Sequence, residues 1–275
     1  MGKLNEVQEK YKRLLCKALQ LFYVNDAKAL FNEPQENAGD GEERKGWKRI
    51  VNERAMAGCV YRYMWCLMQQ AGDSVPVSDI DIEYDRMVKD GLLYYQKELF
   101  CECGKANEKG QCKIHAKCFQ VIYNETQRKR KANGNVNDGN EALANIIRKA
   151  IRPDIILHNR NVGGVENNGL VVEFKKDYNE LNNDAIAFDM AKLYYFTCPQ
   201  SKSLQYKLGA MVILRSQYSD VGFIVDQKIL GGCKVCANDI EEIATMEIEA
   251  FLMGNSSRMP KCLSKHSDDS KKCMS

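Results

Sequence analysis

The stretch that decides the fold is Arg152-Pro153-Asp154-Ile155-Ile156 together with Val171-Val172-Glu173-Phe174-Lys175. Both segments are short apolar runs with charged residues at one end. The loop between them, NRNVGGVENN (residues 159–168), consists mostly of turn-forming residues. This pattern predicts two strands that pair as an antiparallel hairpin.

The hairpin brings two carboxylates and an ammonium group together. In a hairpin centred near residue 163, Asp154 lies opposite Glu173, and Glu173 and Lys175 project from the same face because side chains alternate along a strand. Opposed carboxylates destabilise a sheet unless a cation lies between them. Mg²⁺ prefers oxygen ligands and acidifies a bound water, and Lys175 could position that water and offset developing negative charge. The arrangement suits phosphodiester hydrolysis. The alternative is that these are solvated strand-end charges paired with one another.

Two predicted helices flank the hairpin. The first spans residues 46–71, and Glu53 lies one turn before its apolar stripe of Met56, Val60, Tyr63, Met64 and Leu67. A carboxylate on a buried face needs a partner, which the metal would supply. The alternative for Glu53 is an exposed first-turn charge or an arginine pair. The second helix spans residues 183–196, and its Asp189 and Lys192 taken alone indicate an ordinary surface pair.

The remaining pattern predicts an α/β core with helices covering a sheet. The predicted domain organisation is an N-terminal helix and linker (1–45), a core (46–254) with an insertion at about 97–139, and a disordered tail (255–275). Within these limits the sequence predicts the following elements: a helix over 4–24, a loop over 32–45, a strand over 78–86, a helix over 141–150, strands over 210–214 and 221–225, and a helix over 239–253.

The insertion contains a cysteine cluster of unusual spacing. Its five candidate metal ligands are Cys101, Cys103, Cys112, His115 and Cys118. Four of them could hold a structural Zn²⁺, and free thiols are the alternative. For Cys233-x-x-Cys236 the favoured interpretation is a reduced surface turn. The basic run Gln127–Lys131 is either a solvated loop or a contact for nucleic-acid phosphates.

Composition narrows the class of protein. The chain has 275 residues, of which 44% are hydrophobic and 28% charged, with a formal net charge of +3. This excludes a fibrous or wholly disordered chain, and the small net charge does not identify a nucleic-acid binder. No uncharged apolar run is long enough for a membrane span, and the N-terminus lacks a signal-peptide pattern. We therefore expect a cytoplasmic protein without a membrane partner.

Taken in order, these motifs resemble the PD-(D/E)xK nuclease superfamily, with its restriction-endonuclease-like fold, and are similar to a group of small bacterial members. The resemblance implies a core of order α-β-β-β-α-β over about residues 50–226. It rests on motifs spread along the chain: Asn52–Ala55, Asp81–Arg86, Arg152–Ile156, Leu170–Lys176, Asp189-x-x-Lys192-Leu193 and Lys207–Gly209. It also implies that Glu53, Asp154 and Glu173 bind Mg²⁺ or Mn²⁺ and that Lys175 is the catalytic lysine.

The leading expectation is a metal-dependent nuclease that acts on DNA rather than RNA. A second hypothesis is a catalytically inactive nuclease-fold protein that binds nucleic acid and carries a structural zinc site. A third is an α/β protein that only mediates interactions. The oligomeric state stays open, and a homodimer is one alternative.

Overall fold

The computed structural model describes residues 3–31, 53–71, 76–82, 86–89, 92–96, 153–159, 164–176, 183–199 and 205–252. Several sequence predictions therefore lie outside the described residues. These are the loop over 32–45, the insertion at 97–139 with its cysteine cluster and basic run, the helix over 141–150 and the tail over 255–275.

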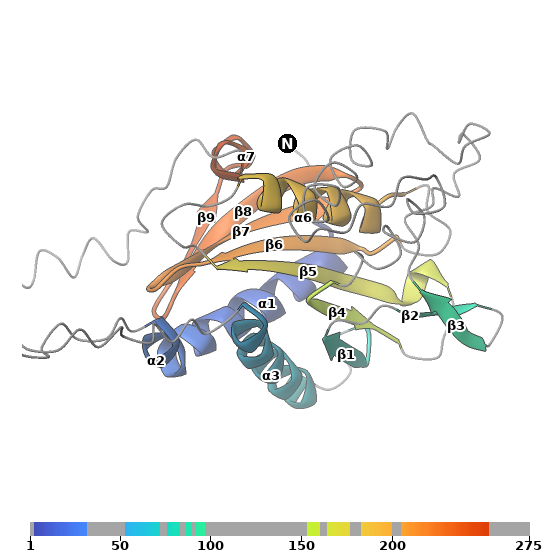
Figure 1. Cartoon of the computed structure of the whole chain (residues 1–275), viewed down its shortest axis with the longest axis horizontal. Coiled ribbons are helices and arrows are strands. Elements are labelled where there is room, and N and C mark those ends of the chain that lie inside the picture. Colours follow the sequence, from blue (N-terminus) through green and yellow to red (C-terminus); the bar gives the residue numbers. More distant parts are fainter. Residues whose placement is uncertain are drawn as a thin grey trace, which may run out of the picture.

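The described residues form a mixed seven-stranded sheet with helices on both faces (Figure 1). The strand order is β1-β4-β5-β6-β7-β8-β9. The strands are β1 (Asp79–Ile82), β4 (Ile155–His158), β5 (Asn168–Lys176), β6 (Leu208–Leu214), β7 (Tyr218–Val225), β8 (Lys228–Cys236) and β9 (Ile240–Ile243). Neighbours β5 and β6 run parallel, and the other neighbouring pairs run antiparallel. A separate pair joins β2 (Arg86–Lys89) to β3 (Leu92–Gln96).

The helices divide the apolar residues into two cores. Helices α1 (Glu6–Asn25), α2 (Ala27–Phe31) and α3 (Glu53–Ala71) lie below the sheet in Figure 1, and α6 (Asn183–Phe196) and α7 (Thr245–Leu252) lie above it. Alternate residues of β5 enter the two cores: Val172 and Phe174 pack with α1 and α3, and Val171 packs with α6. The strand is therefore buried on both faces, as its apolar run indicates. No described helix is both long and apolar enough to cross a membrane.

The predicted hairpin and its register are confirmed. Strands β4 and β5 are antiparallel, with Ile155 opposite Val172 and Ile156 opposite Val171. Asp154 directly precedes β4, so the same register brings it opposite Glu173. The helix at 183–196 is also confirmed, and the described part of the helix at 46–71 is α3.

Two other element predictions need correction. The single strand over 78–86 is wrong: β1 ends at Ile82, and Arg86 begins β2 of the separate pair. The single helix over 239–253 is wrong as well, because β9 takes up Ile240–Ile243 before α7 begins at Thr245. Strand β9 joins the sheet through β8, a tertiary contact that the local pattern does not reveal.

Strand β8 was not predicted, because the segment around Gly231-Gly232 has the composition of a turn. Cys233 and Cys236 are buried in this strand, so a surface turn at these cysteines is also wrong. The turn before β8 consists of Asp226 and Gln227, both at positive φ, which is the geometry of a tight hairpin turn without glycine.

Glycine at position 232 lets α7 pack directly on the sheet. A Cβ there would lie 2.4 Å from the Val221 carbonyl oxygen and 2.8 Å from Ile248 Cγ1 on α7. The backbone oxygen cannot rotate away, since β7 and β8 are paired at this point. The glycine pair is therefore a packing requirement of β8.

We expect Gly232→Ala to lower the free energy of unfolding by about 1–3 kcal/mol, because the added methyl group overlaps fixed backbone. Urea denaturation measures the change. Gly58→Ala is the matched control, since a Cβ at Gly58 of α3 meets nothing within 4 Å. Replacing a helical glycine by alanine should stabilise that variant by up to about 1 kcal/mol. Equal stability of the two variants would contradict this packing role.

Candidate active site

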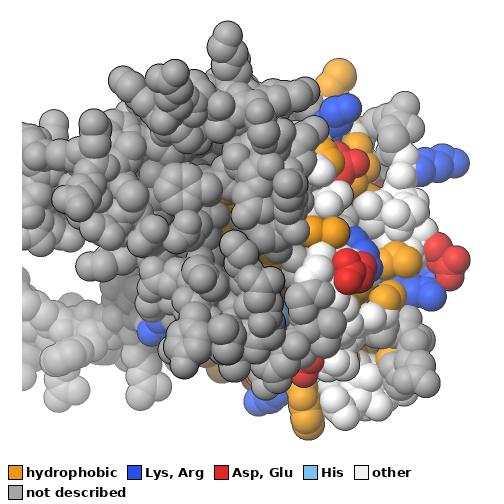
Figure 2. Space-filling view, turned by 90° about the vertical axis from the view of Figure 1, so that its right-hand side faces the viewer, with side chains coloured by type: hydrophobic (Ala, Val, Ile, Leu, Met, Phe, Trp, Pro, Cys, Tyr) orange, Lys and Arg blue, Asp and Glu red, His pale blue; other side chains and the backbone are white. Residues whose placement is uncertain are grey.

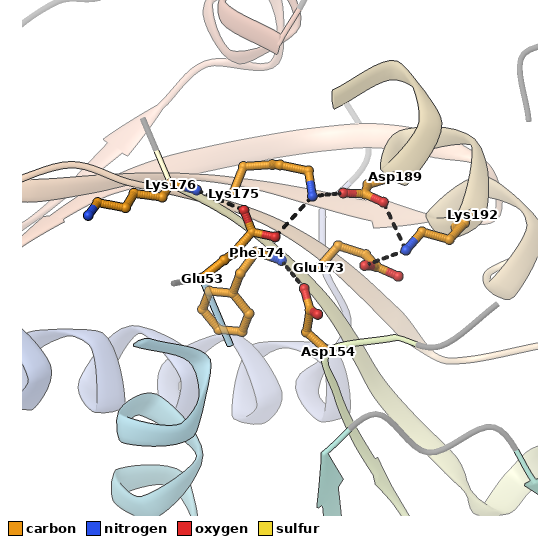
Figure 3. Close-up of polar contacts among 8 residues, drawn as sticks. All are labelled: Glu53, Asp154, Glu173, Phe174, Lys175, Lys176, Asp189 and Lys192. Carbon is orange, nitrogen blue, oxygen red and sulfur yellow. Dashed lines mark hydrogen bonds and ion pairs between the residues drawn. The ribbon is translucent and has the colours of Figure 1, made fainter. Parts of the chain in front are cut away.

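Six charged side chains meet near the C-terminal end of β5 (Figure 3). They come from four parts of the chain: Glu53 is the first residue of α3, Asp154 precedes β4, Glu173 and Lys175 lie on β5, and Asp189 and Lys192 lie on α6. We call these six residues the charged cluster. It joins the sheet to a helix on each of its faces.

The inner part of the charged cluster is almost completely buried. Glu173, Asp189 and Lys192 expose only 1%, 3% and 5% of their surface. Lys192 Nζ lies 2.7 Å from Glu173 Oε2 and 2.8 Å from Asp189 Oδ1, so one ammonium group binds both carboxylates. A buried charge is tolerated only with such partners.

The outer part centres on Lys175. Its Nζ lies 2.5 Å from Asp189 Oδ2 and 3.1 Å from Glu53 Oε1, and its side chain is about one fifth exposed. The backbone N–H of Lys176 donates to Glu53 Oε2 at 3.1 Å, so both Glu53 oxygens are bound. The Lys176 ammonium group points away from the charged cluster (Figure 3). It lies over the ring of Phe31, 5.1 Å from the ring centre. Lys175 is therefore the β5 lysine that belongs to the site.

Asp154 is oriented by the strand opposite. Its Oδ2 accepts a hydrogen bond from the backbone N–H of Phe174 at 2.7 Å. Burial raises the pKa of Asp154 to about 6, although the Phe174 N–H and Lys192 oppose this change. Removal of the carboxylate from water therefore outweighs the stabilisation that its neighbours give the charged form.

Burial dominates the electrostatics of Glu173 as well. Burial raises the pKa of Glu173 well above its usual value, against the attraction of Lys192, and Asp189 and Asp154 raise it further. The pKa of Asp189 is lowered instead. Burial raises this pKa too, but the attraction of Lys192 and Lys175 outweighs burial. Glu173 Oε1 is buried and has no hydrogen-bond donor among the described residues.

Burial lowers the pKa of Lys175, but the carboxylates of Asp189 and Glu53 outweigh burial and raise it, so this lysine is a stable cation. Counting the charged cluster fully ionised, four carboxylates face two ammonium groups. The surplus is two negative charges.

The residues that could hold a metal are Asp154 and Glu173. Within the described residues, no group of three or more His, Cys, Asp or Glu side chains is placed to hold an ion. Two carboxylates are nevertheless enough for Mg²⁺, which keeps several waters and also binds substrate phosphate. The donorless Glu173 Oε1 and the surplus charge fit a divalent cation. Glu53 instead binds Lys175 and Lys176, and its role as a ligand stays a prediction.

Sequence reasoning assigned Asp189 and Lys192 wrongly. Taken alone they were interpreted as a surface pair, but both are buried against β5. The signal in the sequence is that the helix is apolar on several sides. Further apolar residues accompany the stripe of Ile186, Met190 and Leu193, as expected of a buried helix. The alternative of solvated strand-end charges is also wrong for Glu173, which is buried.

A second polar pair lies on the neighbouring strands. His158 Nε2 of β4 lies 2.7 Å from Asp81 Oδ2 of β1, and both side chains are about nine-tenths buried.

Surface charge in the view of Figure 2 is mixed: over the described part of this face, acidic and basic side chains are interspersed with hydrophobic ones. The described surface in that view therefore provides no single basic field.

Comparisons with known proteins add no family. The chain matches no protein-family model, and neither the curated proteins nor the solved structures searched contain a match. The function is therefore argued from the geometry of the site.

We expect Lys192→Met to lower the free energy of unfolding by about 3–5 kcal/mol, because it leaves two buried carboxylates without their shared cation. Chemical denaturation at pH 7 measures the loss. The control is Lys10→Met, which removes an exposed i,i+4 pair with Glu6 and should change stability by less than about 0.5 kcal/mol. A Lys192 variant as stable as the control would show that the buried pairs do not hold the fold.

The raised pKa of Asp154 predicts an unusual pH dependence in the metal-free protein. The folded state keeps the proton up to pH about 6, whereas the unfolded chain releases it near 3.8. The folded state therefore binds more protons between these values, and the free energy of unfolding falls as pH rises from about 4 to about 6, by up to about 3 kcal/mol.

Urea denaturation in a chelator across this pH range tests the dependence. Asp154→Asn should make the fall less steep, because the amide does not titrate, while Glu173, whose pKa is also raised, keeps its own contribution. Asp226→Asn, at the exposed turn between β7 and β8, should keep the wild-type slope. Parallel slopes for wild type and Asp154→Asn would rule out a raised pKa.

Proposed function

We propose that this protein is a metal-dependent nuclease of the PD-(D/E)xK type, with the charged cluster as its active site. The single observation that carries the proposal is the pairing of the buried Glu173 carboxylate with the partly buried Asp154 carboxylate, with Lys175 alongside. Glu173 Oε1 has no donor among the described residues, and burial raises the pKa of both carboxylates, so their charged forms lack compensation. A divalent cation would supply the missing charge and the missing partner together.

In this proposal each residue of the charged cluster except Lys192 has a role in catalysis or in positioning. Asp154 and Glu173 would hold Mg²⁺ or Mn²⁺, which supplies an acidified water and stabilises charge on a phosphoryl oxygen. Lys175 is a cation throughout the neutral pH range, so it would orient the attacking water and offset charge in the transition state. Glu53 and Asp189 bind the Lys175 ammonium group from two sides and so fix its position.

The order of elements supports the same proposal. Helix α3, strands β1, β4 and β5, helix α6 and strand β6 follow one another along the chain, with β2 and β3 between β1 and β4. This is the order α-β-β-β-α-β that the resemblance implies. Asp154 directly precedes β4 and Glu173 lies on β5, and these are the two central strands of that core. The substrate we propose is DNA rather than RNA.

One observation favours the inactive alternative. Lys192 already binds Glu173 Oε2 and Asp189 Oδ1, so an internal cation neutralises part of the site. If that pairing is all that Glu173 needs, the charged cluster is structural, and the protein binds nucleic acid on an inactive scaffold. Such a protein would bind DNA or RNA, cleave neither, and contain about one zinc per chain if the cluster Cys101–Cys118 is a zinc site.

Metal binding tests the site directly. Titration calorimetry with Mn²⁺ should detect one site on the wild-type chain, and both Asp154→Asn and Glu173→Gln should weaken binding at least about 10-fold, because each removes one of few protein ligands. Glu6→Gln, which changes an exposed carboxylate of α1, is the control and should bind as the wild type does. Wild-type affinity in both site variants would place the metal elsewhere.

Cleavage tests the mechanism. With Mg²⁺ or Mn²⁺ and plasmid or single-stranded DNA, Lys175→Ala should lower the cleavage rate at least about 100-fold and leave DNA binding in Ca²⁺ largely intact, because the lysine acts on the transition state. Lys176→Ala is the matched control, since its ammonium group points away from the site. Binding without cleavage of any DNA or RNA would favour the inactive scaffold. Cleavage that survives both Lys175→Ala and Asp154→Ala would overturn the assignment.

A further inference from the structure

Two buried thiols far apart in the sequence are in contact. Cys16 lies in the middle of α1 and Cys233 in β8, 217 positions later, and their sulfur atoms are 3.3 Å apart. Both side chains are almost completely inaccessible, and both are free cysteines. A disulfide needs a sulfur–sulfur distance of about 2.0 Å, so the two atoms must approach by a little over 1 Å.

A small cavity lies next to this contact. It has a volume of about 240 Å³, and its walls include Lys12, Phe223, Gly232 and Glu242. Gly232 directly precedes Cys233, and Lys12 lies one helical turn before Cys16. Glu242 of β9 pairs with Cys233 across the sheet and binds Lys12 Nζ at 2.8 Å. The cavity is wide enough for a water-sized oxidant, and it is lined by neighbours of the two cysteines rather than by the thiols themselves.

We propose that Cys16 and Cys233 are a redox-active pair that a small hydroperoxide converts into a disulfide, fastening helix α1 to strand β8. The contact between the two sulfur atoms and the adjacent cavity carry this proposal. It is independent of the nuclease proposal, because the thiol pair lies on the sheet face covered by α1 and α3, among residues of that core.

The chemistry balances without a further reactant. One sulfur attacks a peroxide oxygen: the S–O bond forms, the O–O bond breaks, and the departing oxygen leaves as water with the thiol proton. The second sulfur then attacks the sulfenic acid: the S–S bond forms, the S–O bond breaks, and the hydroxyl leaves as water with the second thiol proton. Two thiols are oxidised, and one hydrogen peroxide is reduced to two waters.

The surroundings favour closure over further oxidation. The sulfenic acid formed on either cysteine would already have the other sulfur in contact, whereas external thiols have no access to a buried site. The hydrogen bond with Cys16, together with burial, raises the pKa of Cys233. The Cys233 sulfur therefore holds its proton, and its attack on a peroxide is slow compared with that of an exposed thiolate.

Peptide mapping tests the pair sharply, because trypsin releases each cysteine on its own short peptide. Residues 14–17 (LLCK) carry Cys16, and residues 229–234 (ILGGCK) carry Cys233. The folded full-length chain is treated with hydrogen peroxide, alkylated and digested without reductant. We expect these two peptides linked, at the sum of their masses less two hydrogens. Reduction should separate them.

The variants and the stability readout complete the experiment. Cys16→Ser and Cys233→Ser should each abolish the linked peptide, and Cys66→Ser, at an exposed position on α3, should retain it. The crosslink closes a loop of more than 200 residues, so the oxidised wild type should unfold about 10 °C higher than the reduced form, and neither pair variant should show this rise.

Three results would overturn the proposal. In the first, Cys16 and Cys233 are both recovered as thiols when Cys66 is fully oxidised. In the second, Cys16 and Cys233 are oxidised to sulfinic or sulfonic acid without forming a link. In the third, Cys16 or Cys233 is linked to a different cysteine. The wild-type map decides among these outcomes even if a serine variant fails to fold.

Discussion

An ion-pair network, buried at its inner end, joins the sheet to a helix on each of its faces. Lys192 forms ion pairs with Glu173 of β5 and Asp189 of α6. Asp189 also forms an ion pair with Lys175, which in turn binds Glu53 at the start of α3. A helix on each face of the sheet is thereby tied to the same strand. Removing charges from water is costly, and the cost is offset only when each has a partner at short range. The network therefore fixes the end of β5 in one arrangement.

The same network lies in an apolar part of the sheet. Apolar residues fill both faces of β5 up to Phe174, so they lower the local dielectric around Glu173 and Asp154. In that environment each unpaired negative charge is expensive, and the pKa of both carboxylates rises.

Glycine and cysteine positions in β8 illustrate how a local pattern can mislead. Gly231 and Gly232 are unfavourable inside a strand by propensity, yet Gly232 occupies the point where α7 contacts the sheet. Cys233, next in sequence, lies opposite α1 and contacts Cys16. Neither contact has a signature in the neighbouring sequence, because the partner residues belong to helices at opposite ends of the chain. The turn at Asp226 and Gln227 lacks the glycine that usually marks a tight hairpin, so the sequence also does not indicate that strand β8 follows.

The sequence by itself determined the hairpin of β4 and β5, its register and the face on which each residue lies, because strand side chains alternate with a period of two and the turn centre fixes the pairing. It therefore brought Asp154 opposite Glu173 and Lys175 beside them. Only the tertiary structure decided that Asp189 and Lys192 are buried, that Glu53 binds Lys175, and that Cys16 contacts Cys233. The physical reason is that periodicity defines the faces of each element, whereas the partner of a face depends on how whole elements pack.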